Sequence, residues 1–165
     1  SGGMGDGGGC HPRDNIALSW LSDELGLRFN WFDNIMKQRE VQTEWLADLI
    51  EEHLDGRGIN ILGKSFKPET NITTGSPSIL LKNILEERGH GVFIWDPYID
   101  EPWEEIKKMY DDFCASDSHL YFIGTKHPEF TSFPFEEGSI IIDPWRFIPN
   151  IDGCKVIHIG DNING

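Results

Sequence analysis

The sequence predicts an α/β fold in which a helical segment, residues 1–56, precedes a Rossmann-like parallel sheet built from residues 57–165. Three observations support this division. Apolar residues follow a helical spacing up to Leu54, residues 55–58 (Asp-Gly-Arg-Gly) interrupt it, and short apolar runs then alternate with helical segments. Short, nearly continuous apolar strands separated by helices are typical of a parallel sheet that helices cover on both faces.

Two helices are expected in the first segment. Pro12 suits the first turn of a helix, and helix-forming residues follow from Arg13 to about Leu25. A longer amphipathic helix is expected from about Trp31 to Leu54, because its apolar residues recur three and four positions apart. Four aromatic residues of this segment are expected in a core or a dimer interface: Trp20, Trp31, Phe32 and Trp45.

The second segment is expected to contain five strands and two helices. The strands are expected at residues 59–62, 91–95, 120–124, 140–143 and 156–159, and the helices at residues 76–88 and 101–110. Open sheets of this kind bind ligands beyond the carboxyl ends of their strands. Residues that follow a strand are therefore the first candidates for a binding site.

The composition argues against several classes of partner. The chain has 28 Asp and Glu against 14 Lys and Arg, and its formal net charge of −14 repels the phosphates of nucleic acids. No apolar run reaches the ~18 residues of a membrane-spanning helix, so no membrane partner is expected. The three cysteines have the spacing of neither a disulfide framework nor a zinc site, which favours a cytoplasmic location. The histidine spacing predicts no metal site.

A glycine-rich string opens the chain. Residues 3–8 have the GxGxxG spacing of a dinucleotide-binding fingerprint. That fingerprint needs a buried strand before it and a helix after it, and only Ser1 and Gly2 precede the string. The glycines instead lead directly into Cys10 and its neighbours, so the string is not expected to bind NAD.

The segment from Gly3 to Asp14 resembles the GxGxGGxCxPKD signature around the active-site cysteine of the UDP-glucose/GDP-mannose dehydrogenase family. It reads GMGDGGGCHPRD, so that only the lysine position differs, being Arg13. Further motifs follow in the family's order: a strand leading into GxxFKP at residues 61–68, SPS at 76–78, a strand ending in Asp-Pro at 95–97, and Asp followed by Arg at 143–146. Residues 71–75 depart from the acidic pair and arginine frequent in the family, which leaves the sugar nucleotide open.

This resemblance implies an NAD-dependent nucleotide-sugar 6-dehydrogenase, which oxidises the primary alcohol of a UDP- or GDP-hexose to the uronic acid in two hydride transfers. It implies that residues 1–56 form the cysteine loop and helices of the family's central dimerisation domain, and that residues 57–165 form the UDP/GDP-sugar-binding domain. NAD would be bound mainly by an N-terminal domain without a counterpart in this sequence, and a homodimer is expected. The implied catalytic residues are Cys10 and Asp14, and the implied substrate-binding residues are Gly7, Gly8, Arg13, Phe66, Lys67 and Arg146.

The residue types suit this chemistry. A cysteine thiolate can add to the aldehyde formed by the first oxidation, and the thioester formed by the second is hydrolysed by water. Cys10 lies between a glycine loop and the helix expected from Pro12, where the helix N-terminus and loop amides favour a thiolate and an oxyanion. Asp14, expected in the first helical turn, has the alternative role of complementing the helix dipole. Lys67 offers a charge to a phosphate, and Phe66 a stacking face.

Two other functions are weighed against this one. A nucleotide-sugar-binding module without activity of its own would use the same Phe66 and Lys67. A purely structural interaction domain would leave Cys10 and its glycine loop unexplained. Since no dinucleotide fingerprint follows an expected strand, the chain by itself is expected to be inactive. Cys114, Cys154 and His11 are not expected to take part.

Overall fold

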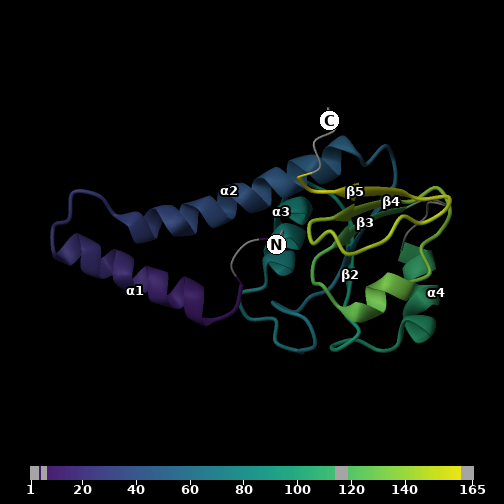
Figure 1. Cartoon of the computed structure of the whole chain (residues 1–165), viewed down its shortest axis with the longest axis horizontal. Coiled ribbons are helices and arrows are strands. Elements are labelled where there is room, and N and C mark those ends of the chain that lie inside the picture. Colours follow the sequence, from purple (N-terminus) through teal and green to yellow (C-terminus); the bar gives the residue numbers. More distant parts are fainter. Residues whose placement is uncertain (1–3, 5–6, 114–118, 161–165) are drawn as a thin grey trace.

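The computed structural model describes residues 4, 7–113 and 119–160, and confirms a parallel α/β sheet (Figure 1). The strands are β1 (Gly58–Leu62), β2 (Val92–Trp95), β3 (His119–Ile123), β4 (Ile140–Asp143) and β5 (Lys155–His158). They pair in the order β2-β1-β3-β4-β5, and every pairing is parallel. Because β1 lies between β2 and β3, the loops after these three strands meet at one place on the sheet edge.

Helices precede the sheet and connect its strands. They are α1 (Cys10–Glu24), α2 (Trp31–Glu52), α3 (Pro77–Glu87), α4 (Trp103–Phe113) and the short 3-10 helix η1 (Pro128–Ser132). Ser76 caps α3, because its side chain accepts a hydrogen bond from Ser78 N–H. Among the residues described, no helix combines the length and apolar character that crossing a membrane requires.

The sheet is buried on both faces, which explains its continuous apolar strands. Side chains alternate between the faces, so that Ile59 and Ile61 of β1 pack with α2 and α3, whereas Leu62 packs on the other side. The first face holds Leu46, Ala47 and Ile50 of α2 and Leu81 and Leu85 of α3. The opposite face holds Trp103 and Tyr110 of α4 and Phe130 of η1. The boundary at residues 56 and 57 stays a prediction, because the end of α2 shares a core with the sheet.

Helix α1 and the first half of α2 form a hairpin that projects away from the sheet (Figure 1). Trp20 is 64% exposed, Trp31 62% and Trp45 48%, so the expectation that these residues belong to a core is wrong for this chain. The reason is geometric: only the C-terminal part of α2 reaches the sheet and buries its side chains there. The alternative expectation, a dimer interface, stays a prediction.

Helix α1 begins at Cys10, two residues before the expected start at Pro12. Gly9 is the N-cap, and Pro12 is the third helical residue. Proline is tolerated there because the first four N–H groups of a helix have no partner within the helix. The expectation that Asp14 lies in the first turn is therefore wrong, since the first turn contains no acidic residue.

Candidate functional site

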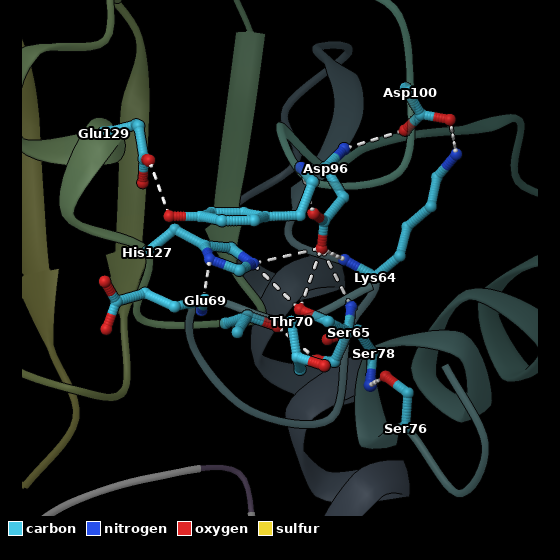
Figure 2. Close-up of polar contacts among 12 residues, drawn as sticks. Lys64, Ser65, Glu69, Thr70, Ser76, Ser78, Asp96, Asp100, His127 and Glu129 are labelled. Atoms are coloured by element: carbon cyan, nitrogen blue, oxygen red, sulfur yellow. Dashed lines mark hydrogen bonds and ion pairs between the residues drawn. The ribbon is translucent and has the colours of Figure 1, made fainter. Parts of the chain in front are cut away.

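A polar cluster occupies the carboxyl edge of the sheet, where the loops after β1, β2 and β3 meet (Figure 2). Its central residue is Asp96, which follows β2 and is fully buried. Asp96 Oδ2 accepts hydrogen bonds from Lys64 N–H at 2.7 Å and Ser65 N–H at 2.9 Å, and Oδ1 accepts one from Tyr98 N–H at 2.9 Å. The carboxylate therefore fixes the loop that follows β1, which carries Phe66 and Lys67.

His127, which follows β3, completes this cluster and is also fully buried. Its Nε2 lies 2.8 Å from Ser65 Oγ and 3.1 Å from Asp96 Oδ2. Its Nδ1 lies 3.2 Å from the backbone nitrogen of Glu69, which can only donate. Nδ1 is therefore the acceptor, and the proton of the neutral ring is on Nε2, facing the carboxylate.

The environment of Asp96 favours its charged form. Burial by itself would raise its pKa, but the hydrogen bonds from His127, Ser65 and Tyr98 outweigh burial and hold the pKa well below its usual value. Ser65 Oγ also donates to Oδ2 at 3.0 Å. The cluster thus contains one buried anion surrounded by donors.

Serine, histidine and aspartate also form the triad of many hydrolases, but this cluster has a different geometry. In a triad the serine and the carboxylate bind opposite nitrogens of the imidazole. Here Ser65 and Asp96 both contact Nε2, and Nδ1 binds the backbone of Glu69. Ser65 is only 1% exposed, so its hydroxyl is closed to a substrate. The cluster holds a loop and does not provide a nucleophile.

The loop after β1 contains two lysines with different environments. Lys64 Nζ forms an ion pair with Asp100 Oδ1 at 2.5 Å, and its side chain is 21% exposed. Lys67 is exposed, and its Nζ lies 5.4 Å from the centre of the Phe66 ring. Among the described residues no carboxylate pairs with Lys67. Lys67 is therefore the lysine of this loop that can meet an anionic ligand.

The glycine string packs against this loop. Met4 is buried, and Gly8 N–H donates to Gly75 O at 3.3 Å. A Cβ at Gly8 would lie 3.0 Å from two carbons of the Phe66 ring, and one at Gly75 would lie 2.4 Å from Gly8 O. Both glycines also have positive φ angles, of 90° and 70°, so that the contact requires glycine at both positions.

The predicted nucleophile lies immediately beyond this contact. Cys10 is the first residue of α1, and its free thiol is exposed. Arg13 and Asp14 are also exposed and pair with each other, with Nε 3.1 Å from Oδ1. The structure thus brings Gly7 and Gly8 against Phe66. Cys10, Arg13 and Asp14 follow on the first turns of α1.

Arg39 of α2 is a residue that sequence reasoning missed. It lines a hollow of about 350 Å³ together with Gly8, Gly9, Arg13 and Thr74, and a second one of about 590 Å³ between α1 and α2. Its Nη2 donates to Gly75 O at 2.9 Å, and its buried Nε has no hydrogen-bond partner among the described atoms. Arg39 therefore holds the Thr74–Gly75 turn against the cysteine loop. Nothing in the sequence around Arg39 distinguishes it from an ordinary charged residue on the surface of a helix.

Arg146 lies at the same sheet edge, after β4. Its backbone has a φ angle of 57°, and its N–H donates to Asp143 Oδ1 at 3.1 Å. The carboxylate of Asp143 also accepts from Phe147 N–H at 2.7 Å and Ile148 N–H at 2.8 Å, so Asp143 fixes this turn. The contacts described for Arg146 do not join it to Phe66 or Lys67.

Sequence reasoning also missed His127. It lies 62 residues from Ser65 and 31 from Asp96, and no spacing joins the three. Cys154 is half-buried, its Sγ donates to Glu136 O at 3.3 Å, and burial raises the pKa of its thiol. Cys114 lies outside the described residues. No three His, Cys, Asp or Glu residues among those described are placed to hold a metal ion.

The described residues do not fit a dinucleotide site. Gly7 and Gly8 pack against Phe66 and Pro77, and no described strand precedes them. The loop after β1 begins Gly63-Lys64-Ser65-Phe66 and does not have the glycine spacing that lets a backbone approach a pyrophosphate. No NAD contact is therefore assigned to this chain.

Comparison with known proteins identifies relatives of the chain. A family model, described as the UDP binding domain of the UDP-glucose/GDP-mannose dehydrogenase family, matches residues 60–153. The UDP-glucose 6-dehydrogenase AglM of Haloferax volcanii is 30% identical over 160 residues, which are 94% of this chain and 36% of that protein. The GDP-mannose 6-dehydrogenase of Pseudomonas putida is 35% identical over 94 residues, 57% of this chain and 21% of that protein.

Solved structures show the same fold. A UDP-glucose dehydrogenase from Pyrobaculum islandicum superimposes with a TM-score of 0.72 at 23% identity, over 94% of this chain and 38% of that one. A GDP-mannose dehydrogenase from Pseudomonas aeruginosa superimposes with a TM-score of 0.73 at 22% identity, over 94% of this chain and 40% of that one. The chain spans between about a fifth and two fifths of the length of these proteins.

Proposed function

Because this chain belongs to the UDP-glucose/GDP-mannose dehydrogenase family, we propose that it binds the nucleotide sugar of an NAD-dependent 6-dehydrogenase and supplies its thiol nucleophile. The substrate is a UDP- or GDP-hexose, and the product is the uronic acid. One observation carries the proposal: the loop with Phe66 and Lys67 packs against Gly7 and Gly8, two residues before the exposed Cys10. A binding group and a nucleophile are thereby adjacent.

The binding part of the proposal rests on the sheet edge. Lys67 is exposed, without a carboxylate partner among the described residues, and lies where ligands of parallel sheets bind. Its ammonium group offers charge to a diphosphate, and the half-buried Phe66 beside it offers an apolar face. A chain of net charge −14 needs such a local cation to hold an anion.

The thiol part rests on the position of Cys10 at the first residue of α1. N–H groups of the first turn lack partners within the helix, and the positive end of the helix dipole favours negative charge there. The sulfur would add to the aldehyde carbon, and the resulting oxyanion would face these N–H groups. Asp14, exposed and paired with Arg13, would assist the proton and water steps. NAD supplies the hydride acceptor when bound, and no step through it is assigned to the described residues.

A second candidate function is a nucleotide-sugar-binding module that has no activity alone. It is favoured by one observation, namely that the described residues offer a loop for the nucleotide sugar and no fingerprint for NAD. Turnover assays of the chain, with and without a separately produced NAD-binding domain from a relative, separate the two candidates.

The binding proposal is tested by Lys67→Ala. Loss of a charge-assisted hydrogen bond to phosphate is expected to weaken binding of UDP-glucose or GDP-mannose about tenfold, measured by calorimetry. Lys108→Ala is the matched control, because Lys108 is also exposed but lies on α4 and not in a loop at the carboxyl edge of the sheet. Its affinity is expected to stay within about twofold of the unmodified chain. Tight NAD binding without any nucleotide-sugar binding would overturn the proposal.

We further propose that the projecting hairpin pairs with a second copy of the chain. Its exposed apolar residues are Ile16, Leu18, Trp20, Leu21, Leu25, Leu27, Phe29, Trp31, Val41 and Trp45. So large an exposed apolar surface is typical of an interaction site. Trp20→Glu is expected to convert a dimer into a monomer in light scattering, whereas Met109→Glu, an equally exposed position on α4, is not. A monomeric unmodified chain at about 100 μM contradicts this proposal.

A further inference from the structure

The segment from Lys64 to Glu69 is held at both of its ends. At the first end Asp96 Oδ2 accepts from Lys64 N–H and Ser65 N–H, and Thr125 Oγ1 donates to Ser65 O at 2.6 Å. At the second end Glu69 N–H donates to His127 Nδ1. Phe66 and Lys67, the residues assigned to the ligand, lie between these two anchors.

His127 contacts both anchors with one rigid ring. Nε2 contacts Ser65 Oγ and Nδ1 accepts from Glu69 N–H, so the ring sets the separation of the two ends of the segment. The ring is fully buried and stacks on Tyr98, with centroids 4.8 Å apart and planes inclined by 23°. The Tyr98 hydroxyl in turn donates to Glu129 Oε1 at 2.9 Å.

Glu69 has a backbone conformation that needs such an anchor. Its φ angle is 55°, in the left-handed region that non-glycine residues seldom adopt. Such conformations persist where the surroundings impose them, and they concentrate at ligand-binding segments. The hydrogen bond from Glu69 N–H to His127 Nδ1 is the contact the structure provides at this residue's backbone. Without it, no other hydrogen bond described for the Glu69 backbone holds this conformation.

We propose that His127 is a positioning residue for the nucleotide sugar: by accepting the hydrogen bond from Glu69 N–H, it fixes the second end of the segment and keeps Phe66 and Lys67 in their binding conformation. This inference rests on the proposed function, because it assumes that these two residues meet the ligand. The ligand then binds only the held loop, and the apparent dissociation constant rises in proportion as the held population falls. A loop held in about a tenth of the molecules would bind about tenfold more weakly.

Two substitutions of His127 form a matched pair. In His127→Asn the side-chain oxygen occupies the place of Nδ1 and can still accept from Glu69 N–H, whereas the contacts of Nε2 are lost. In His127→Phe the ring and its stack on Tyr98 are kept, but both nitrogens are lost. The two variants therefore share the loss at Ser65 and Asp96 and differ at Glu69. Tyr98→Phe, which removes only the bond to Glu129, is the control.

Hydrogen exchange of the Glu69 amide and binding of UDP-glucose and GDP-mannose are measured for each variant, together with its unfolding midpoint. His127→Phe is expected to exchange Glu69 at least about tenfold faster and to bind the preferred nucleotide sugar about tenfold more weakly. His127→Asn, which also loses the ring stack, is expected to restore protection and to bind within about threefold of the unmodified chain. If His127 had a merely structural role, the affinity of each variant for the nucleotide sugar would instead decrease in step with its unfolding midpoint.

The results separate this inference from the proposed function. If the unmodified chain binds neither nucleotide sugar, the proposed function fails, and the exchange of Glu69 still decides whether His127 orders the loop. If the unmodified chain binds and His127→Phe binds within about twofold of it, the positioning role is overturned. Equal weakening in the Asn and Phe variants also overturns it, because the acceptor for Glu69 would then be irrelevant.

Discussion

Replacing Cys10 by serine in an intact dehydrogenase that contains this chain is expected to stop the reaction at the aldehyde or at a covalent ester. The first oxidation needs no nucleophile, but the aldehyde must be converted into an adduct before a second hydride can leave. Serine lacks the acidity and nucleophilicity of a thiol at the start of α1. Formation of the uronic acid is expected to fall on the order of 10³-fold or more, with one NADH formed per sugar if the reaction stops at the aldehyde and two per enzyme-bound sugar if it stops at the ester.

Cys154→Ser is the control for this experiment. Its thiol is half-buried and donates to Glu136 O, so its replacement is expected to leave turnover close to that of the unmodified enzyme. In the chain itself, iodoacetamide is expected to label the exposed Cys10 before Cys154, whose pKa burial raises, as followed by mass spectrometry. Complete oxidation to the uronic acid by Cys10→Ser would remove Cys10 from the mechanism.

Replacing Asp96 by alanine is expected to destabilise the chain by about 3 kcal/mol or more, measured by urea unfolding. The substitution removes the acceptor of three N–H groups, the buried one of Ser65 and the partly buried ones of Lys64 and Tyr98. Each such group costs roughly 1–3 kcal/mol. Asp152→Ala, at an exposed carboxylate, is the control and is expected to change the free energy of unfolding by less than about 0.5 kcal/mol. A loss below about 1 kcal/mol for Asp96→Ala would contradict the anchoring role.

The charge of Asp96 also predicts a dependence on pH. Its pKa is lower in the folded chain than in the unfolded chain, so the unfolded state takes up the proton first as the pH falls. The stabilisation is therefore complete above the unfolded carboxyl pKa of about 3.9 and is lost progressively below it. The difference in stability between the chain and Asp96→Asn should be constant above about pH 5 and shrink towards pH 3. A difference that grows on acidification would contradict the assignment.

Elements with a strong local pattern could be predicted closely. The strand expected at residues 140–143 is β4, and the strand expected at 59–62 is β1 with one further residue, Gly58. The helix expected at 101–110 begins only at Trp103, after Pro102, and extends to Phe113. Its start could not be predicted because Pro102 is tolerated both before a helix and within its first turn.

Candidate site residues were found where a motif marks them and missed where none does. Cys10, Phe66 and Lys67 lie in runs that resemble a family motif. Arg39 and His127 lie in ordinary surroundings, and their importance arises only from Gly75 and Glu69, which they contact across the fold. Spacing along a chain carries no information about contacts of this kind, because they depend on which loops the topology brings together.

The sequence by itself determined the α/β class and the strands, because apolar periodicity and glycine positions act locally, and its resemblance to a family motif marked the cysteine loop. Only the tertiary structure decided that Lys64 is tied to Asp100 while Lys67 stays exposed, and that Trp20 and Trp31 lie outside any core of this chain. It also decided that His127 links Ser65 to Glu69. The physical reason is the strand order β2-β1-β3, which places the ends of three strands side by side although 31 residues separate Ser65 from Asp96 and 31 separate Asp96 from His127.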